Sequence, residues 1–244
     1  MRQTFELTLD GKPLHVPAGT SFGALAAETQ AAYPGTILLA TLNGVLHELR
    51  ATVEENGVLR FLTIQDKAGY QSYERSAILL LLAAYHRLYG EKSAAVWIDY
   101  KQSGALRCHI VGRKEVSETE LARLEAEMCA LSTAALPIEK RSVPTREAVR
   151  LFAARGMQDK AELFRFRIHS SVNIYRLDSY EDYFYGYMLP DSSYLTDFSL
   201  RSYEDGFVLR LPAQQLPMQL AAFQPSQKIF RAMEESRANL SRQG

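Results

Sequence analysis

An unbroken apolar run near residue 80 constrains the fold most strongly. The segment from Ser72 to Tyr89 has the character of one long helix, and its middle, Ser76 to Ala84, is apolar on every side. A helix that is apolar all round is buried all round. The longest apolar run, Ala77 to Tyr85, covers less than half of the roughly 20 residues that span a bilayer. We therefore expect this helix to form the core of a domain and not to cross a membrane.

The first 65 or so residues predict a smaller α+β unit. Alternating apolar residues indicate strands, and the pairs Asp10-Gly11 and Asn43-Gly44 are hairpin turn signals. Thr20 or Ser21 is placed to cap a short helix. The resulting order is strand, strand, helix, then three strands, which is the order of a ubiquitin-like β-grasp.

These patterns predict an α+β chain with two domains. A β-grasp domain covers residues 1–66, a polar linker covers Gln65 to Tyr70, and a larger α+β domain covers residues 71–212. Residues 213–244 are expected to form a polar, weakly helical tail or linker, with a helix from Lys228 to Leu240. Within the larger domain, Ser117 and Glu120 form a capping box at a helix start. Tyrosine-rich strands are expected at Val172–Leu177, Tyr183–Leu189, Tyr194–Leu200 and Phe207–Leu211.

Composition narrows the class of protein. The 28 basic and 28 acidic residues give a formal net charge of zero, which argues against a broad basic face that grips duplex nucleic acid. Two cysteines suit a reduced compartment, and the first residues lack the apolar core of a signal peptide. We expect a cytoplasmic chain. A phosphate-binding P-loop is absent, and the five histidines lack the paired spacing of a zinc site.

Two groups of side chains are candidates for binding. Strand alternation places Tyr183, Tyr185 and Tyr187 on one face, which is either covered by a helix or free to hold a ligand or a nucleotide base. Basic residues gather between Lys140 and Arg167, where a solvated helix face is the alternative to an RNA footprint. Among them, Arg165 and Arg167 alternate along a predicted strand and could face an anionic ligand.

Both predicted domains resemble known modules. The first 65 residues resemble a TGS domain, the β-grasp module at the front of threonyl-tRNA synthetases. The segment from Tyr73 to Tyr203 resembles the second additional domain of threonyl- and alanyl-tRNA synthetases, which carries zinc-dependent editing in those enzymes. The family's His-x-x-x-His pair is Arg75 and Leu79 here, and its Cys-x-x-x-His pair is Phe184 and Met188. These four side chains cannot hold zinc, so the resemblance implies a degenerate metal site.

A second resemblance covers roughly residues 3–212. Bacterial nucleoside kinases related to uridine kinase place a TGS-like and a degenerate synthetase-like domain before a P-loop kinase domain. The similar stretches are Leu136–Arg141, Ser170–Leu177, Tyr180–Met188 and Tyr203–Leu209. This resemblance implies that the kinase domain is missing from this chain, and that ATP and Mg²⁺ would belong to that domain. No cofactor is expected in the chain itself.

These observations lead to three functional hypotheses. The main one is a non-catalytic regulatory or ligand-binding front half of a uridine kinase-like phosphotransferase. In it, Arg75 pairs with a small anionic or nucleotide-like ligand, or else forms a salt bridge with Glu74 or Asp182. The alternative is a tRNA- or RNA-binding module, and a third hypothesis is a trans-editing hydrolase of aminoacyl-tRNA.

Overall fold

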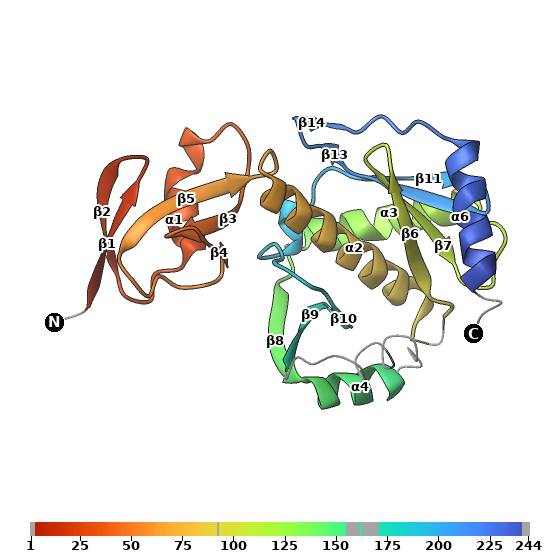
Figure 1. The fold of residues 1–244 in the computed structure, drawn as a ribbon, viewed down its shortest axis with the longest axis horizontal. Coiled ribbons are helices and arrows are strands. Elements are labelled where there is room, and N and C mark those ends of the chain that lie inside the picture. The colour runs from red at the N-terminus through yellow and green to blue at the C-terminus, as the bar shows by residue number, and fades with distance from the viewer. Residues whose placement is uncertain (1–2, 92, 155–161, 163–170, 241–244) are drawn as a thin grey trace.

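The computed structural model describes residues 3–91, 93–154, 162 and 171–240. Figure 1 shows two lobes side by side. We call residues 3–64 the β-grasp unit and residues 67–240 the larger unit. The β-grasp unit and the larger unit have separate hydrophobic cores, which meet around Leu38, Ile64 and Tyr194.

The β-grasp unit is one five-stranded sheet packed against one helix. Its elements are β1 (Thr4–Leu9), β2 (Lys12–Pro17), α1 (Phe22–Thr29), a 3₁₀ helix (Gln30–Ala32), β3 (Ile37–Leu42), β4 (Val45–Glu48) and β5 (Gly57–Thr63). The strand order is β2-β1-β5-β3-β4, and β1 and β5 are parallel. This is the β-grasp arrangement that the element order predicts, within an α+β chain.

Local signals produced the turns and the helix start of this unit. Asp10 and Gly11 have φ of 49° and 79°, and Asn43 and Gly44 have φ of 52° and 81°, as a tight hairpin turn requires. Ser21 caps α1, because its hydroxyl accepts a hydrogen bond from the Ala24 amide at 3.1 Å.

Helix α2 (Lys67–Tyr89) joins the two lobes and starts earlier than predicted. The segment Gln65 to Tyr70 is therefore mostly helix and not a linker. Gly69 allows this, because a Cβ there would collide with the Thr63 carbonyl at the end of β5. None of the helices among the described residues combines the length and the hydropathy that a membrane span needs.

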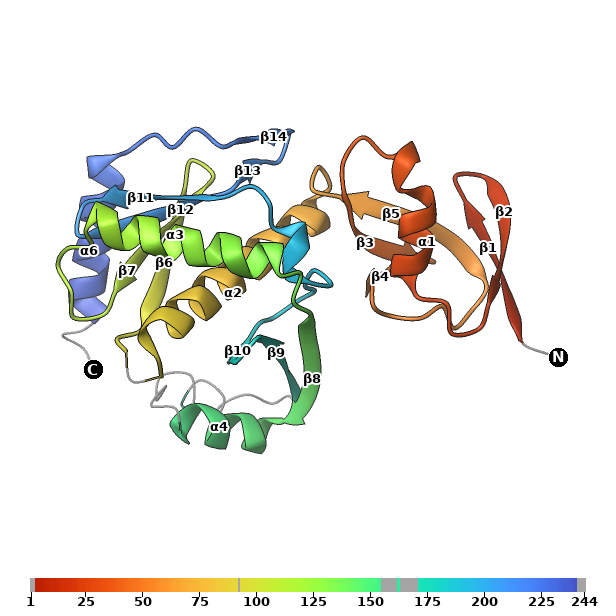
Figure 2. The ribbon, with the colours of Figure 1, turned by 180° about the vertical axis from the view of Figure 1, so that it is seen from behind.

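The core of the larger unit lies between two helices and a four-stranded sheet. Helices α2 and α3 (Glu118–Thr133) run side by side over one face of the sheet (Figure 2). The sheet has the order β11-β12-β7-β6, with β6 (Val96–Gln102), β7 (Ala105–Ile110), β11 (Ser199–Tyr203) and β12 (Gly206–Arg210). The predicted capping box is confirmed at the start of α3, where Ser117 and Glu120 each bond the other's backbone amide.

A second, three-stranded sheet lies beside α2. It has the order β10-β9-β8, with β8 (Ile138–Pro144), β9 (Ser171–Leu177) and β10 (Tyr180–Tyr183). Helix α4 (Thr145–Ala154) follows β8 directly and buries Ala148 and Phe152 against this sheet. A 3₁₀ helix (Ser192–Tyr194) ends where the predicted strand from Tyr194 to Leu200 should start, and the observed strand β11 begins only at Ser199.

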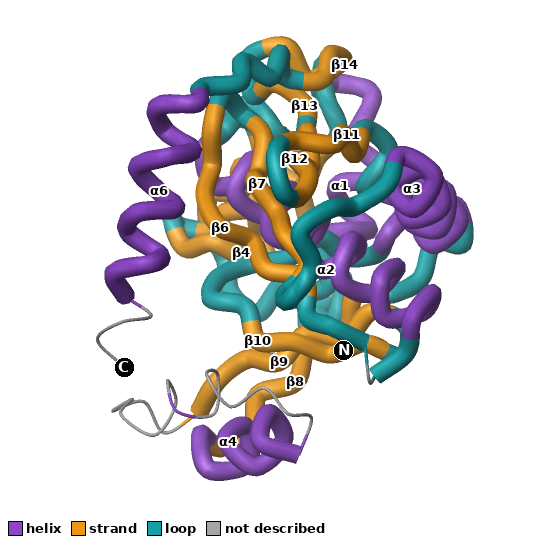
Figure 3. Tube along the Cα trace, turned by 90° about the vertical axis from the view of Figure 1, so that its right-hand side faces the viewer, coloured by secondary structure: helices purple, strands orange, loops and turns teal. Residues whose placement is uncertain are grey.

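The C-terminal segment packs on the larger unit and is not a free tail. It forms β13 (Pro212–Ala213), β14 (Leu216–Leu220) and α6 (Gln227–Leu240). Figure 3 shows α6 on the face of the four-stranded sheet that is opposite α2 and α3. Phe223 and Phe230 pack edge-on against Tyr203. The polar composition of this segment gave no indication of this apolar contact.

Candidate functional site

Residues 184–189 form a loop between the two lobes, and we call them the junction loop. The predicted strand from Tyr183 to Leu189 is wrong beyond Tyr183, where β10 ends. Gly186 interrupts it with φ of +118°, and a Cβ at this glycine would lie 2.8 Å from the Arg75 guanidinium carbon. Because strand alternation fails here, Tyr183, Tyr185 and Tyr187 do not share one sheet face.

Arg75 binds the protein's own backbone. Its Nε and one terminal nitrogen donate to the Tyr187 carbonyl at 3.1 and 3.0 Å, and the Ser72 hydroxyl donates to the same oxygen at 3.0 Å. Burial lowers the pKa of the Arg75 guanidinium. Of the two salt-bridge partners expected for Arg75, Glu74 pairs instead with Lys101. In this structure Arg75 fastens α2 to the junction loop.

The four positions that the family resemblance assigns to zinc are partly or fully enclosed. Leu79 and Met188 are buried, and half-buried Phe184 packs edge-on to Tyr175 with ring centroids 6.5 Å apart. Beside them, the Ser76 hydroxyl accepts from the Leu189 amide at 3.0 Å. Among the described residues, no group of three or more His, Cys, Asp or Glu side chains is placed to hold a metal ion.

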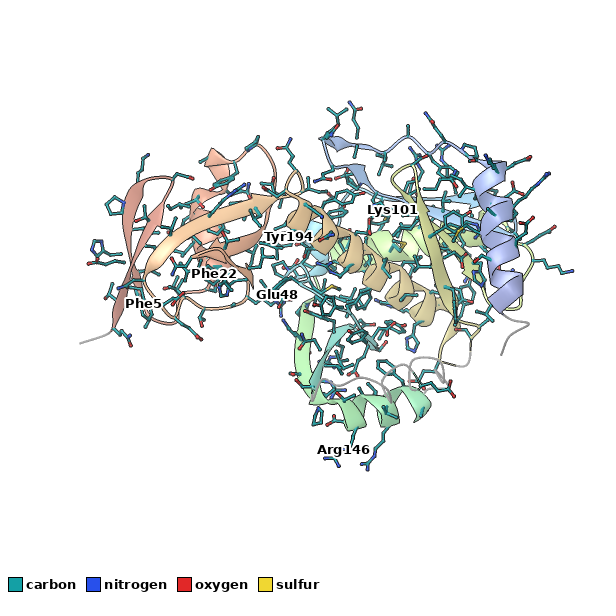
Figure 4. The ribbon with its side chains drawn as sticks, viewed as in Figure 1. Phe5, Phe22, Glu48, Lys101, Arg146 and Tyr194 are labelled. Atoms are coloured by element: carbon teal, nitrogen blue, oxygen red, sulfur yellow. The ribbon has the colours of Figure 1, made fainter. Side chains whose placement is uncertain are left out.

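Glu48 of β4 connects the β-grasp unit to this loop. One carboxylate oxygen accepts from the Tyr175 hydroxyl at 2.7 Å and from the Met188 amide at 3.0 Å. The other oxygen lies 3.3 Å from the Lys140 ammonium. Figure 4 shows Glu48 at the edge of the β-grasp unit that faces the larger unit.

Tyr175 is the central side chain of this contact. Its hydroxyl lies 2.7 Å from both the Glu48 carboxylate and the Gly186 carbonyl. Burial raises the pKa of Tyr175, and the negative charge of Glu48 raises it further. The phenol therefore stays protonated and donates. Neither Glu48 nor Tyr175 is among the predicted site residues, because their contact joins residues 127 positions apart and has no local signature.

Several predicted basic residues are neutralised by ion pairs. Lys140 contacts Glu48, and Arg141 lies 3.1 Å from both Glu147 and Glu181. Two others are free in the described part of the chain. Arg146 and Arg150 are exposed one turn apart on α4 and form no ion pair there, and Figure 4 shows Arg146 extending outward from the helix. Four predicted residues lie outside the described residues: Arg155, Lys160, Arg165 and Arg167.

Comparison with known proteins shows similarity to threonine–tRNA ligases. The chain is 26% identical over 191 residues to the ligase of Francisella tularensis subsp. novicida, covering 78% of this chain and 30% of the ligase. It is 29% identical over 164 residues to the ligase of Thermotoga maritima, covering 67% of this chain and 25% of the ligase. The chain thus matches less than a third of the length of these relatives. No protein-family model matches it.

Proposed function

We propose that the chain is an RNA-binding module that takes tRNA or a tRNA-like RNA as its ligand and does not hydrolyse it. The observation that carries this proposal is the extent of the similarity to threonine–tRNA ligases. The matched segment of 191 residues is longer than either the β-grasp unit or the larger unit, so the similarity reaches both. The role as regulatory front half of a nucleoside kinase rests on the motif resemblance alone, and these relatives favour the RNA-binding alternative.

The filled junction supports binding without zinc-dependent hydrolysis. A hydrolytic zinc needs three protein ligands and an open position for water. Here Arg75 is bonded to a backbone carbonyl, and Leu79 and Met188 are buried in the core. The same contacts argue against Arg75 as the receptor of a small anion, since its guanidinium already has a partner.

Metal analysis tests the hydrolase alternative. We expect less than one-tenth of a zinc ion per chain, measured by plasma mass spectrometry after dialysis against zinc-containing and then metal-free buffer. The physical reason is that arginine, leucine and phenylalanine supply no zinc ligand, and a methionine thioether is a poor one. One tightly held zinc per chain would contradict this expectation and favour trans-editing.

The exposed face of α4 offers a contact for phosphates. Arg146 and Arg150 are one helical turn apart and have no acidic partner there. Unpaired arginines bind phosphates by charge and by paired N–H donors. A small basic face of this kind is compatible with a net charge of zero.

Salt-dependent binding of tRNA tests the proposed function. The chain is expected to bind tRNA at low salt, and Arg146→Glu/Arg150→Glu is expected to weaken binding at every salt concentration. The slope of log affinity against log salt should fall by about 0.7–0.9 for each phosphate contact that is lost. Fluorescence anisotropy with labelled tRNA measures both quantities.

The control for this experiment is Arg123→Glu, which reverses an exposed arginine on α3. This variant should keep the parent slope apart from a small effect of net charge. Absence of tRNA binding by the parent chain at about 50 mM salt would overturn the proposal, because phosphate contacts are strong under that condition.

A further inference from the structure

Tyr185 is unusually exposed for an aromatic residue. Its side chain is 81% accessible, the highest value among the exposed large hydrophobic residues of the described chain. Its neighbours on both sides, Phe184 and Gly186, are only partly exposed, and Met188 is buried. Removing the apolar faces of a tyrosine ring from water lowers the free energy of the system. Contact of this ring with a partner would therefore be favourable.

Hydrogen bonds hold the backbone of the loop that carries Tyr185, although the residues at the former metal positions in this loop are unsuited to binding zinc. After Tyr185, every residue up to Leu189 uses a backbone group to bond a side chain. The carbonyls of Gly186 and Tyr187 accept from Tyr175 and from Ser72 and Arg75, respectively. The amides of Met188 and Leu189 donate to Glu48 and Ser76, both at 3.0 Å.

These bonds come from three separate parts of the chain. Ser72, Arg75 and Ser76 lie on α2, Tyr175 lies on β9, and Glu48 belongs to the β-grasp unit. The loop is therefore ordered before any ligand arrives. A preordered loop loses less conformational entropy on binding, so an exposed ring on it is suited to recognition.

A positive charge lies next to this loop. The Lys140 ammonium is 5.7 Å from the centre of the Tyr187 ring and 5.6 Å from that of Tyr175, within cation–π range. Its ion pair with Glu48 is at 3.3 Å, and its side chain keeps 35% of its surface accessible to solvent. Lys140 can therefore approach a phosphate while its aliphatic stem stays in place.

We propose that Tyr185 is a stacking platform for one unpaired base of the bound RNA, and that Lys140, which lies against Tyr187 of the same loop, takes a nearby phosphate. An aromatic face and an adjacent cation are the means by which proteins hold single-stranded nucleic acid. The base would lie on the outer surface of the junction loop, where Tyr185 is exposed, since Leu79 and Met188 at the former metal positions are buried in the core. This inference rests on the proposed RNA-binding function and names the part of the RNA that is read.

Two RNA probes separate stacking from phosphate binding. One is a hairpin closed by a non-nucleotide linker and carrying a single-stranded extension, and the other is the same hairpin with a blunt end, so that only the extension supplies unpaired bases. With the full chain, Tyr185→Ala is expected to weaken binding of the extended hairpin by about 5- to 150-fold. Tyr185→Phe keeps the stacking face and should bind like the parent. Neither substitution should change binding of the blunt hairpin.

The control is Trp97→Ala, which removes a half-exposed aromatic ring from the four-stranded sheet. It should leave the preference for the extended hairpin unchanged. The stacking role is wrong if Tyr185→Ala binds the extended hairpin as tightly as the parent does. If Arg146→Glu/Arg150→Glu still weakens both hairpins, only the stacking role fails, whereas a parent chain that binds neither hairpin refutes the RNA-binding function itself.

Discussion

Replacing Arg107 with alanine is expected to lower the free energy of unfolding by about 1.5–3 kcal/mol, the usual range for hydrogen bonds to a charged group. Arg107 lies on β7 under α6 and is only 2% exposed. Its guanidinium donates to Asp205 and to the Cys108 carbonyl, and it lies 3.8 Å from Asp99. Removing this buried cation leaves Asp205, whose side chain is 39% exposed, without its partner, whereas Asp99 keeps its ion pair with His109 at 2.8 Å. Urea unfolding followed by circular dichroism measures the loss.

A glycine and two aromatic rings surround the Arg107 guanidinium. Gly206 leaves space for the guanidinium, since a Cβ there would collide with it. The guanidinium carbon also lies 5.9 and 5.8 Å from the rings of Tyr203 and Phe230, so α6 should loosen in the same variant. Arg201→Ala, on an exposed position of β11, is the control and should change stability by less than about 0.5 kcal/mol. Equal stability of the Arg107 and Arg201 variants would show that the buried charges are not coupled to folding.

Replacing Glu48 with alanine is expected to loosen the contact between the β-grasp unit and the larger unit. Of its three donors, the Tyr175 hydroxyl retains the Gly186 carbonyl and Lys140 can turn to solvent. Within the described residues the Met188 amide loses its only acceptor, and an unsatisfied buried donor costs about 1–3 kcal/mol. Stability should fall by about that amount, as measured by urea unfolding.

A second measurement separates this loosening from a general loss of stability. Small-angle scattering of the Glu48→Ala variant should give a larger radius of gyration than the parent chain gives. Glu54→Ala, an exposed carboxylate on the same unit, is the matched control and should change neither quantity. If the two variants behave alike, Glu48 does not hold the units together. In that case the junction loop would depend on α2 and β9 alone for its order.

The candidate site was only partly predictable from the sequence. The resemblance drew attention to Arg75 and Met188, yet their partners are a backbone carbonyl and a carboxylate from the other unit. Alternation of tyrosines predicted a strand through Tyr187, but alternation carries no information about acceptors that lie elsewhere in the chain. Gly186 was the one local sign that the strand would stop, because glycine readily adopts positive φ.

Sequence patterns predicted the features that depend on short stretches of chain. Turn residues set the hairpins at Gly11 and Gly44, Ser117 and Glu120 set the start of α3, and the order of apolar segments set the β-grasp. Each of these depends on neighbours a few residues apart or on a repeating period. The tertiary structure alone decided that the junction loop is held by Glu48, that α6 covers a sheet, and that Tyr185 stays in water. Those outcomes depend on contacts between distant residues, whose energies no local pattern encodes.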